Sequence, residues 1–510
     1  MTYVVVGGGL AAAKAVETLR DEGFEGPVTL IGTEDVRPYE RPPLSKGLLL
    51  GTDAPESVFV HSPEWYPEHD VTLRSGVTVT AVDRAAKVVR TDAGDEIAYE
   101  KLLLATGSTP RPLPVPGGDR ALLLRTLTDS RRISDAVTGD SRVVVIGAGW
   151  IGLEVAAAAR TRGATVDVVE AIKLPLANVL GDEIAQVFAD LHRANGVTLH
   201  LNTHAEAVDG NAVRLENGET LPADVVIAGI GVTPNVGLAA DAGLAVDNGV
   251  LVDARLTTSD PDIFAAGDIA NVDHPFLKHR IRVEHWATAL NTGPVAAKAM
   301  LGQDVSYDKL PYFYTDQFDL GMEYTGWVAP DAKPTVVVRG DLASREFIAF
   351  WLVDGKVAAG MNVNVWDVTD QIEALIRSGQ AIDPARLADP SVNLPDLLSL
   401  AAPSARRRVA ARQRVAGCRP SARRRLPPVG AAARQRAAAS RPSACRSQPP
   451  VSERQPAATQ RAAANPQRAE PSAALRSPSR SGTPCRCRVS QLAAPAIRAR
   501  RCVVRRRSRS

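Results

Sequence analysis

Short apolar runs rich in β-branched residues recur between residues 3 and 266, and four of them are followed directly by glycine. Such runs, separated by longer segments with apolar residues at helical spacing, are typical of strands buried in a parallel sheet with helices on its faces. The runs predicted as strands are Tyr3 to Val6, Val28 to Ile31, Lys101 to Leu104, Val143 to Ile146, Thr165 to Val169 and Ile263 to Ala266. The pattern therefore predicts an α/β fold.

Two of these runs continue into the same glycine pattern, 140 residues apart. The first glycine of such a turn permits the tight bend, the second lets the backbone approach a pyrophosphate, and the third small residue lets the helix pack on the strand. The residues expected to contact a dinucleotide are Gly7, Gly9, Ala11 and Ala12 in the first copy and Gly147, Gly149, Ile151 and Gly152 in the second. Two copies predict two dinucleotides, a bound flavin and a nicotinamide.

An acidic residue follows the second strand of each copy. Glu170 lies about twenty residues past its turn, where a carboxylate accepts hydrogen bonds from an adenosine ribose 2′-OH. Glu34 holds a similar position in the first copy, although slightly late. Because a carboxylate repels a 2′-phosphate, Glu170 predicts NADH over NADPH, with Lys173 as the one nearby cation.

Three further charged residues complete the candidate site. Arg41 and Lys46 are cations in the proline-rich stretch PYERPPLSK, which holds them close to the first nucleotide turn. Taken by itself, such a stretch is better interpreted as a rigid surface loop with solvated charges. Asp268 follows the apolar run and Gly267 of TTSDPDIFAAGD, a stretch that resembles the second FAD signature of the pyridine nucleotide-disulfide oxidoreductase superfamily, and the resemblance implies that its carboxylate binds a ribityl hydroxyl of the flavin. The basic run HPFLKHRIRVEHW is either a solvated face or a docking patch for an acidic partner.

Charges and cysteines are unevenly distributed along the 510 residues. Residues 401–510 contain 27 arginines, no lysine, two acidic residues and all five cysteines. Residues 1–400 consequently hold 33 basic and 55 acidic residues, a net charge of −22, and no cysteine. This part of the chain can form no disulfide, no thiolate metal site and no redox-active dithiol. We expect a cytoplasmic protein without a metal, since no run of 18 apolar residues could span a membrane.

Residues 401–510 consist largely of Ala, Arg, Pro, Ser and Gln, and lack aromatic residues. Such a segment cannot bury enough apolar area to order itself, so we predict a disordered tail. One interpretation is a basic arm for nucleic acid or an acidic surface. The complete loss of Lys and Asp favours instead a frameshift product, translated out of frame from GC-rich coding DNA.

The stretch PYERPPLSK after the GGGLA turn resembles the FAD domain of bacterial NADH-dependent ferredoxin and rubredoxin reductases, the putidaredoxin reductase-like flavoproteins that feed oxygenases and cytochromes P450. In the related disulfide reductases a cysteine pair precedes the Ser-Lys at the matching place, where this chain has prolines and Leu44. KLLLATG, GIGVTPN and TTSDPDIFAAGD match further family turns. The resemblance covers residues 1–400 and points away from dithiol chemistry.

The resemblance also implies roles for individual residues. It places Val79 against the adenine, Thr106, Gly107 and Arg125 at the FAD, Gly231 beside the nicotinamide and Trp286 near the isoalloxazine. Lys46 and Glu154 become an ion pair beside the nicotinamide, and we expect these two residues to act in catalysis.

Together these features predict two Rossmann-like FAD/NAD(P)-binding domains, the NAD domain inserted in the FAD domain, and a small α+β C-terminal domain. The expected boundaries are 1–112 and 240–312 for FAD, 113–239 for NAD and 313–400 for the C-terminal domain. The expected function is FAD-dependent transfer of electrons from NADH to a [2Fe-2S] ferredoxin or rubredoxin. The alternatives are an NADH oxidase, a reductase of quinones or other small acceptors, and a flavin-bearing binding protein like the apoptosis-inducing factors. The sequence leaves the oligomeric state and the particular ferredoxin open.

Overall fold

The computed structural model describes residues 2–398. The predictions made for the basic tail fall on residues outside this range. No helix between residues 2 and 398 combines the length and apolar composition that crossing a bilayer requires.

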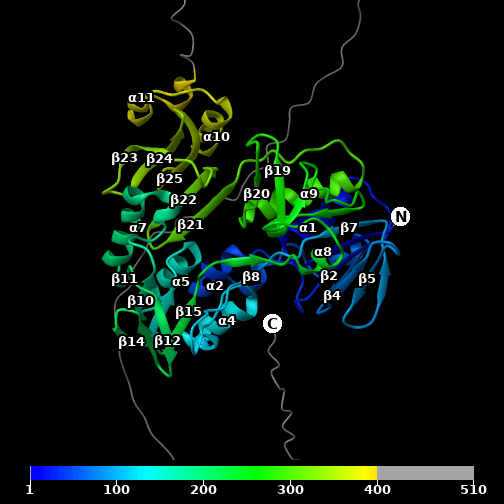
Figure 1. Ribbon diagram of the computed structural model, residues 1–510, viewed down its shortest axis with the longest axis horizontal. Coiled ribbons are helices and arrows are strands. Elements are labelled where there is room, and N and C mark those ends of the chain that lie inside the picture. Colours follow the sequence, from blue (N-terminus) through cyan, green and yellow to red (C-terminus); the bar gives the residue numbers. More distant parts are fainter. Residues whose placement is uncertain (1, 399–510) are drawn as a thin grey trace, which may run out of the picture. The chain divides into compact units, whose positions relative to one another are not determined.

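The first parallel sheet is built from strands on both sides of a long insertion. Its order is β18-β7-β1-β2-β3, and every neighbouring pair is parallel. The strands are β1 (Tyr3–Val6), β2 (Val28–Gly32), β3 (Val71–Ser75), β7 (Lys101–Leu104) and β18 (Ile263–Ala265). Strand β18 follows the insertion in sequence and pairs with β7, which precedes it (Figure 1).

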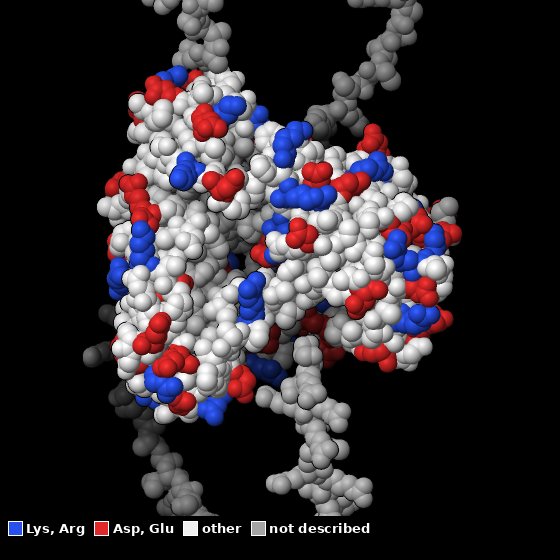
Figure 2. Space-filling model, viewed as in Figure 1, with Lys and Arg blue, Asp and Glu red and all other residues white. Residues whose placement is uncertain are grey.

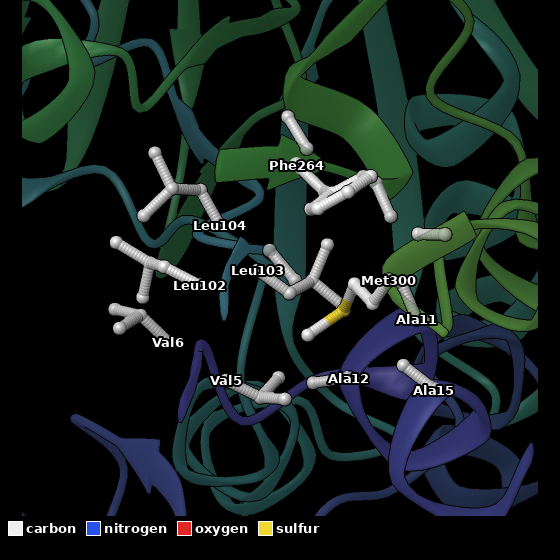
Figure 3. Packing of buried hydrophobic residues seen from close by; sticks show 14 of the residues in the cluster. Val5, Val6, Ala11, Ala12, Ala15, Leu102, Leu103, Leu104, Phe264 and Met300 are labelled. Carbon is white, nitrogen blue, oxygen red and sulfur yellow. The ribbon is translucent and has the colours of Figure 1, made fainter. Parts of the chain in front are cut away.

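Two helices cover one face of this sheet, α1 (Leu10–Asp21) and α9 (Trp286–Met300). They approach closely, because a Cβ added at Gly293 of α9 would lie 2.3 Å from the carbonyl oxygen of Ala11. Figure 3 shows the core between them and the sheet, with Val5, Leu103 and Phe264 lying beside small side chains of α1 and Met300. Alanines on α1 therefore let the helix sit directly on the strand that leads into the first glycine turn.

A second parallel sheet occupies the insertion. Its order is β11-β10-β9-β15, with strands β9 (Arg142–Ile146), β10 (Thr165–Glu170), β11 (Val197–Leu201) and β15 (Val225–Ala228). Helices α5 (Trp150–Thr161) and α7 (Asp182–Ala194) pack with it. The chain enters the insertion through β8 (Ser108–Pro110) and leaves it through β16 (Val232–Pro234), and these two strands pair antiparallel. The nested arrangement predicted from the sequence is confirmed.

The C-terminal part is a five-stranded antiparallel sheet of order β21-β22-β25-β24-β23. Its strands are β21 (Tyr312–Gln317), β22 (Leu320–Gly326), β23 (Thr335–Asp341), β24 (Glu346–Val353) and β25 (Lys356–Val363), followed by α10 (Thr369–Ser378) and α11 (Pro384–Ala388). The α+β prediction is confirmed. Trp150 at the start of α5 packs against Phe313 of β21, so this domain contacts the second glycine turn.

The remaining elements are short. Three-stranded sheets are formed by β4 (Val79–Asp83), β5 (Val88–Thr91) and β6 (Glu96–Ala98), by β12 (Ala205–Asp209), β13 (Ala212–Leu215) and β14 (Thr220–Pro222), and by β17 (Val250–Val252), β19 (Ala270–His274) and β20 (His279–Ile281). The other helices are α2 (Gly47–Leu50), α3 (Trp65–Glu68), α4 (Leu127–Ala136), α6 (Ala177–Leu180) and α8 (Gly237–Asp241).

Candidate functional site

A cavity of about 970 Å³ extends between the two glycine turns. It is lined from all three folded parts of the chain, including β21 through Phe313 and Tyr314. Seventeen of the twenty residues predicted from the sequence line it. These are Gly7, Gly9, Ala11, Glu34, Arg41, Lys46, Val79, Thr106, Gly107, Arg125, Gly149, Ile151, Gly152, Glu154, Gly231, Asp268 and Trp286. Ala12, Gly147 and Glu170 do not line it.

The first glycine turn presents the start of α1 to this cavity. Gly7 has φ +128°, and a Cβ there would lie 2.0 Å from the carbonyl oxygen of Ala105, so only glycine fits. Gly9 precedes the helix with extended backbone, and a Cβ added to it would meet nothing within 4 Å. The open space before a helix N-terminus fits a pyrophosphate, which would accept hydrogen bonds from the free backbone amides.

The second glycine turn presents α5 in the same way. Gly147 has φ +99° and approaches the carbonyl of Gly229, while Gly149 faces open space. The third position differs between the copies. A Cβ at Gly152 would lie 2.0 Å from the carbonyl oxygen of Gly147, whereas Ala12 is fully buried with its methyl group in place. The second copy therefore requires a glycine where the first accepts an alanine.

Glu34 and Arg41 form an ion pair at the cavity wall. Nη2 of Arg41 lies 2.9 Å from Oε1 of Glu34, and the hydroxyl of Tyr39 donates to the other carboxylate oxygen. Burial raises the pKa of Tyr39 to about 12, so this hydroxyl keeps its proton. The two charges predicted near the first nucleotide are thus fixed to each other beside the cavity.

Asp268 is the centre of a second polar group. Its Oδ2 accepts hydrogen bonds from Ser108 at 2.6 Å and from Nη2 of Arg125 at 3.0 Å, and the residue is 9% exposed. Burial, together with the charge of nearby Arg41, lowers the pKa of Arg125 from its ordinary value. Gly107 lies directly against Arg125, since a Cβ there would be 3.1 Å from Nη2.

The two connections between the nucleotide-binding parts are tied together by Asn235. Its side-chain amide donates to the backbone carbonyl of Thr106 at 2.9 Å, and its backbone carbonyl accepts from the Thr106 hydroxyl at 2.9 Å. Its backbone amide donates to the carbonyl of Gly107. The Ala-Thr-Gly turn and the GIGVTPN turn therefore form one hydrogen-bonded unit at the cavity wall.

Lys46 and Glu154 meet across the cavity. Nζ of Lys46 lies 2.7 Å from Oε1 of Glu154, and Glu154 is only 3% exposed. The carboxylate also accepts hydrogen bonds from Ser45 and, at 2.5 Å, from Thr315 of β21. Lys46 lies over the ring of Tyr314, 5.1 Å from its centroid. A buried carboxylate with several donors is held in one orientation.

Trp286 and His285 begin α9 at the edge of the cavity. Trp286 packs edge-on against Tyr314 with ring centroids 6.1 Å apart. His285 packs against Phe313, and burial lowers the pKa of His285 to about 4, so its imidazole is neutral near pH 7. Burial also raises the pKa of Tyr314 to about 12. Aromatic rings and a neutral imidazole therefore lie at this end of the cavity, next to the Lys46–Glu154 pair.

Glu170 ends β10, and its carboxylate turns back to the glycine turn. Oε2 accepts from the backbone amide of Ala148 at 2.7 Å, and Oε1 accepts from that of Ile172 at 3.2 Å. Lys173 forms an exposed ion pair with Asp182. The acid thus lies beside the second turn, and its nearest predicted cation is already partnered.

Two of the basic side chains in the run from His274 to Trp286 are engaged by the fold. Arg280 donates to the carbonyls of Val252 and Asn271, and Arg282 pairs with Glu284 at 2.6 Å. Lys278 and His279 are exposed. A docking role for this stretch would therefore depend mainly on these two residues.

Sequence reasoning missed four side chains that complete the site. Ser45, Ser108, Asn235 and Thr315 orient Glu154, Asp268 and the two connecting turns. Ser45 and Asn235 stand in the PYERPPLSK and GIGVTPN stretches that also carry the family resemblance, which is the one available signal.

Comparison with known proteins agrees with this arrangement. Residues 1–293 match the pyridine nucleotide-disulphide oxidoreductase family and residues 312–398 match the reductase C-terminal family. The chain is 40% identical over 404 residues to the ferredoxin–NAD(+) reductase component of the anthranilate 1,2-dioxygenase system of Burkholderia cepacia, covering 78% of this chain and 99% of that protein. It is 35% identical over 410 residues to putidaredoxin reductase of Pseudomonas putida, covering 78% and 97%.

Solved structures give the same result. The covalent complex of putidaredoxin reductase with putidaredoxin matches with a TM-score of 0.75 at 35% identity, covering 78% of this chain and 98% of that chain. A ferredoxin reductase from Rhodopseudomonas palustris matches with a TM-score of 0.74 at 34% identity, covering 78% and 99%. The chain therefore belongs to the pyridine nucleotide-disulphide oxidoreductase family, among the putidaredoxin reductase-like ferredoxin reductases that carry a reductase C-terminal domain.

Proposed function

We propose that this protein is an FAD-dependent NADH:ferredoxin oxidoreductase, which delivers electrons to a [2Fe-2S] ferredoxin or a rubredoxin serving an oxygenase or a cytochrome P450. The observation that carries the proposal is one cavity that receives both helix N-termini and whose described walls contain no cysteine. With no dithiol at the cavity, electrons have to pass from the flavin to an external acceptor.

FAD would lie along the first turn, with its pyrophosphate at Gly9 and its ribityl chain at Asp268. Arg125 and Ser108 hold the Asp268 carboxylate as an acceptor for a ribityl hydroxyl, and the Glu34–Arg41 pair lies at the adenosine side with Val79. Residues 1–112 and 240–312 would form the FAD domain, residues 113–239 the NAD domain and residues 313–400 the C-terminal domain.

The nicotinamide would enter from the second turn. Gly149 leaves room for the pyrophosphate, and Ile151, Gly231 and Glu154 also line the cavity. When bound, FAD supplies the chemistry of accepting a hydride and releasing its two electrons one at a time. The Lys46–Glu154 pair would act as the catalytic pair that positions the nicotinamide against the flavin, while aromatic rings of β21 and α9 exclude water from that end of the cavity.

We propose NADH as the physiological donor. The Glu170 carboxylate lies beside the second turn and would accept a ribose hydroxyl but repel a 2′-phosphate. Lys173, the nearest candidate for attracting a phosphate, is already paired with Asp182.

The relatives support an iron–sulfur partner. Putidaredoxin reductase has been crystallised with putidaredoxin, and the Burkholderia relative is named as a ferredoxin–NAD(+) reductase component. On the face of the molecule in Figure 2, positive and negative side chains are interspersed and do not gather into one large basic patch. A ferredoxin would therefore be recognised by shape and by local charge pairs near the flavin.

The test is NADH consumption with different acceptors. Purified FAD-loaded protein should reduce cytochrome c rapidly only when a [2Fe-2S] ferredoxin is added, and the rate should saturate with ferredoxin concentration. Equal rates with oxygen or a quinone alone would identify an oxidase or a small-acceptor reductase. A long-lived complex with negligible turnover would indicate a flavin-bearing binding protein.

A further inference from the structure

A series of buried polar side chains leads from Glu154 into the protein and begins at Oε1, the oxygen that also contacts Lys46. The Thr315 hydroxyl donates to Oε1 of Glu154 at 2.5 Å, and Nε2 of Gln317 donates to the Thr315 oxygen at 3.2 Å. Oε1 of Gln317 lies 3.0 Å from Nε2 of His192. The four residues are between 0% and 3% exposed, so water does not replace these contacts.

The series joins two parts of the chain, and Glu154 at its end contacts a third. Glu154 lies on α5 and His192 on α7, both in the inserted NAD-binding part, whereas Thr315 and Gln317 lie on β21 of the C-terminal sheet (Figure 1). Lys46 shares Oε1 of Glu154 with Thr315, and Ser45 donates to the other oxygen, Oε2; both residues come from the first nucleotide-binding part. Glu154 is therefore fixed at a three-way junction.

The direction of every hydrogen bond in the series is determined. A carboxylate only accepts, so the Thr315 hydroxyl must donate its single proton to Glu154 and accept from the Gln317 amide nitrogen. The Gln317 oxygen then faces His192, which must donate from Nε2. Nδ1 of His192 has no partner among the described residues, and burial lowers the pKa of His192, so a neutral ring with its proton on Nε2 satisfies the contact.

We infer that Thr315, Gln317 and His192 are positioning residues that orient the Glu154 carboxylate toward Lys46. The inference rests on the proposed role of the Lys46–Glu154 pair in hydride transfer. His192 sets the direction of the series. If it did not donate, the Gln317 amide could turn over, and the Thr315 hydroxyl would then donate to Gln317 in place of Glu154.

The first experiment measures flavin reduction by NADH in anaerobic stopped flow with the FAD-loaded protein. T315V keeps the shape of the side chain and removes its hydroxyl, so we expect a rate about tenfold lower with little change in NADH affinity. T315S should restore the rate to within about twofold of the original. T325V, which changes another buried threonine on the neighbouring strand β22, is the matched control and should have no such effect.

A double-mutant cycle separates positioning from a general loss of packing. Gln317 acts through Thr315, so T315V/Q317L should reduce the flavin no more slowly than T315V alone. Additive losses, or a T315V variant as fast as the original, would overturn the inference. FAD content and circular dichroism establish that each variant is folded, and T315S provides the test if T315V does not fold.

A second readout is independent of turnover. In protein labelled with ¹⁵N-histidine, His192 should show a protonated Nε2 and a bare Nδ1, with its signals assigned by their loss in H192F. Q317L should shift the Nε2–H proton because its acceptor is removed. A His192 protonated on Nδ1 would contradict the direction of the series.

The variants also distinguish a failure of the positioning inference from a failure of the proposed role of the Lys46–Glu154 pair. If K46M and E154Q slow hydride transfer but T315V does not, the positioning inference is wrong and the proposed function stands. If K46M and E154Q leave hydride transfer unchanged, the proposed role of the pair is wrong and the inference falls with it.

Discussion

Nζ of Lys46 lies 2.7 Å from Oε1 of Glu154, although the two residues are 108 positions apart in the chain. The pair joins the loop after the first nucleotide turn to the helix after the second. It therefore links the two nucleotide-binding parts at the cavity in which we propose that the rings of flavin and nicotinamide meet.

Removing one partner of this pair should be more harmful than removing both charges. K46M leaves a buried carboxylate without its cation, and we expect the free energy of unfolding to fall by about 3 kcal/mol. K46M/E154Q should recover part of that loss, because the amide is neutral and can still accept from Thr315. Urea denaturation of the three proteins measures the difference. A double variant less stable than K46M would contradict the prediction.

Asp268 should determine how tightly FAD is held. Ser108 and Arg125 fix its carboxylate at the cavity, so D268A should weaken FAD binding at least about tenfold, equivalent to about 1.4 kcal/mol. The measurement is the dissociation constant from flavin fluorescence after removal and readdition of FAD. D273A, at an exposed aspartate on β19, is the control and should bind FAD as the original does.

Coenzyme selectivity should depend on the Glu170 carboxylate. We expect kcat/KM for NADH to exceed that for NADPH by about tenfold or more, because the carboxylate would repel the extra phosphate. E170Q retains an acceptor for the Ala148 amide and loses the charge, so the ratio should fall. E183Q, at an exposed acid on α7, should leave the ratio unchanged. Equal kcat/KM for the two coenzymes in the original protein would refute the prediction.

Stability should fall as the pH decreases below about 6.5. His274 is fully buried, donates from Nε2 to the carbonyl of Lys309 and accepts at Nδ1 from the amide of Leu277, and burial lowers its pKa. The unfolded chain, with an ordinary histidine pKa of about 6.5, binds more protons in this range, so the free energy of unfolding rises with pH.

Urea denaturation between pH 5 and pH 7.5 measures this dependence. H274Q can still donate to Lys309 but does not titrate, so its slope should be shallower by up to about 1.4 kcal/mol per pH unit. H279Q, at an exposed histidine on β20, is the control. An H274Q slope equal to that of the original would show that His274 does not contribute.

Local patterns in the sequence were enough to predict the fold. Apolar runs followed by glycine identify β1 and β9, and the glycines at positions 7 and 147 have the positive φ that such turns need. The spacing predicts an acid at the end of the second strand, and Glu170 is the last residue of β10. The direction of its oxygens, toward the amide of Ala148, depends on the local backbone and is not encoded in spacing.

The partners of the site residues were much harder to predict. Ser108 and Asp268 are 160 positions apart, and Thr315 and Glu154 are 161 apart, so no periodicity relates them. His192 and Gln317 lie in an ordinary amphipathic helix and strand, and their contact exists only because the C-terminal sheet packs against α7. The sequence predicts the residues that face the cavity better than the side chains that orient them.

The most direct test of the account is the stoichiometry of electron transfer in a single turnover without oxygen. One equivalent of NADH supplies a hydride, which carries two electrons, and each [2Fe-2S] ferredoxin accepts one. FAD-loaded protein mixed with one equivalent of NADH and excess oxidised ferredoxin should therefore yield two equivalents of reduced ferredoxin by electron paramagnetic resonance, with the flavin oxidised at the end. If NADH reduces the flavin but the ferredoxin stays oxidised, and the flavin is reoxidised only when a quinone or oxygen is supplied, the protein is not a ferredoxin reductase.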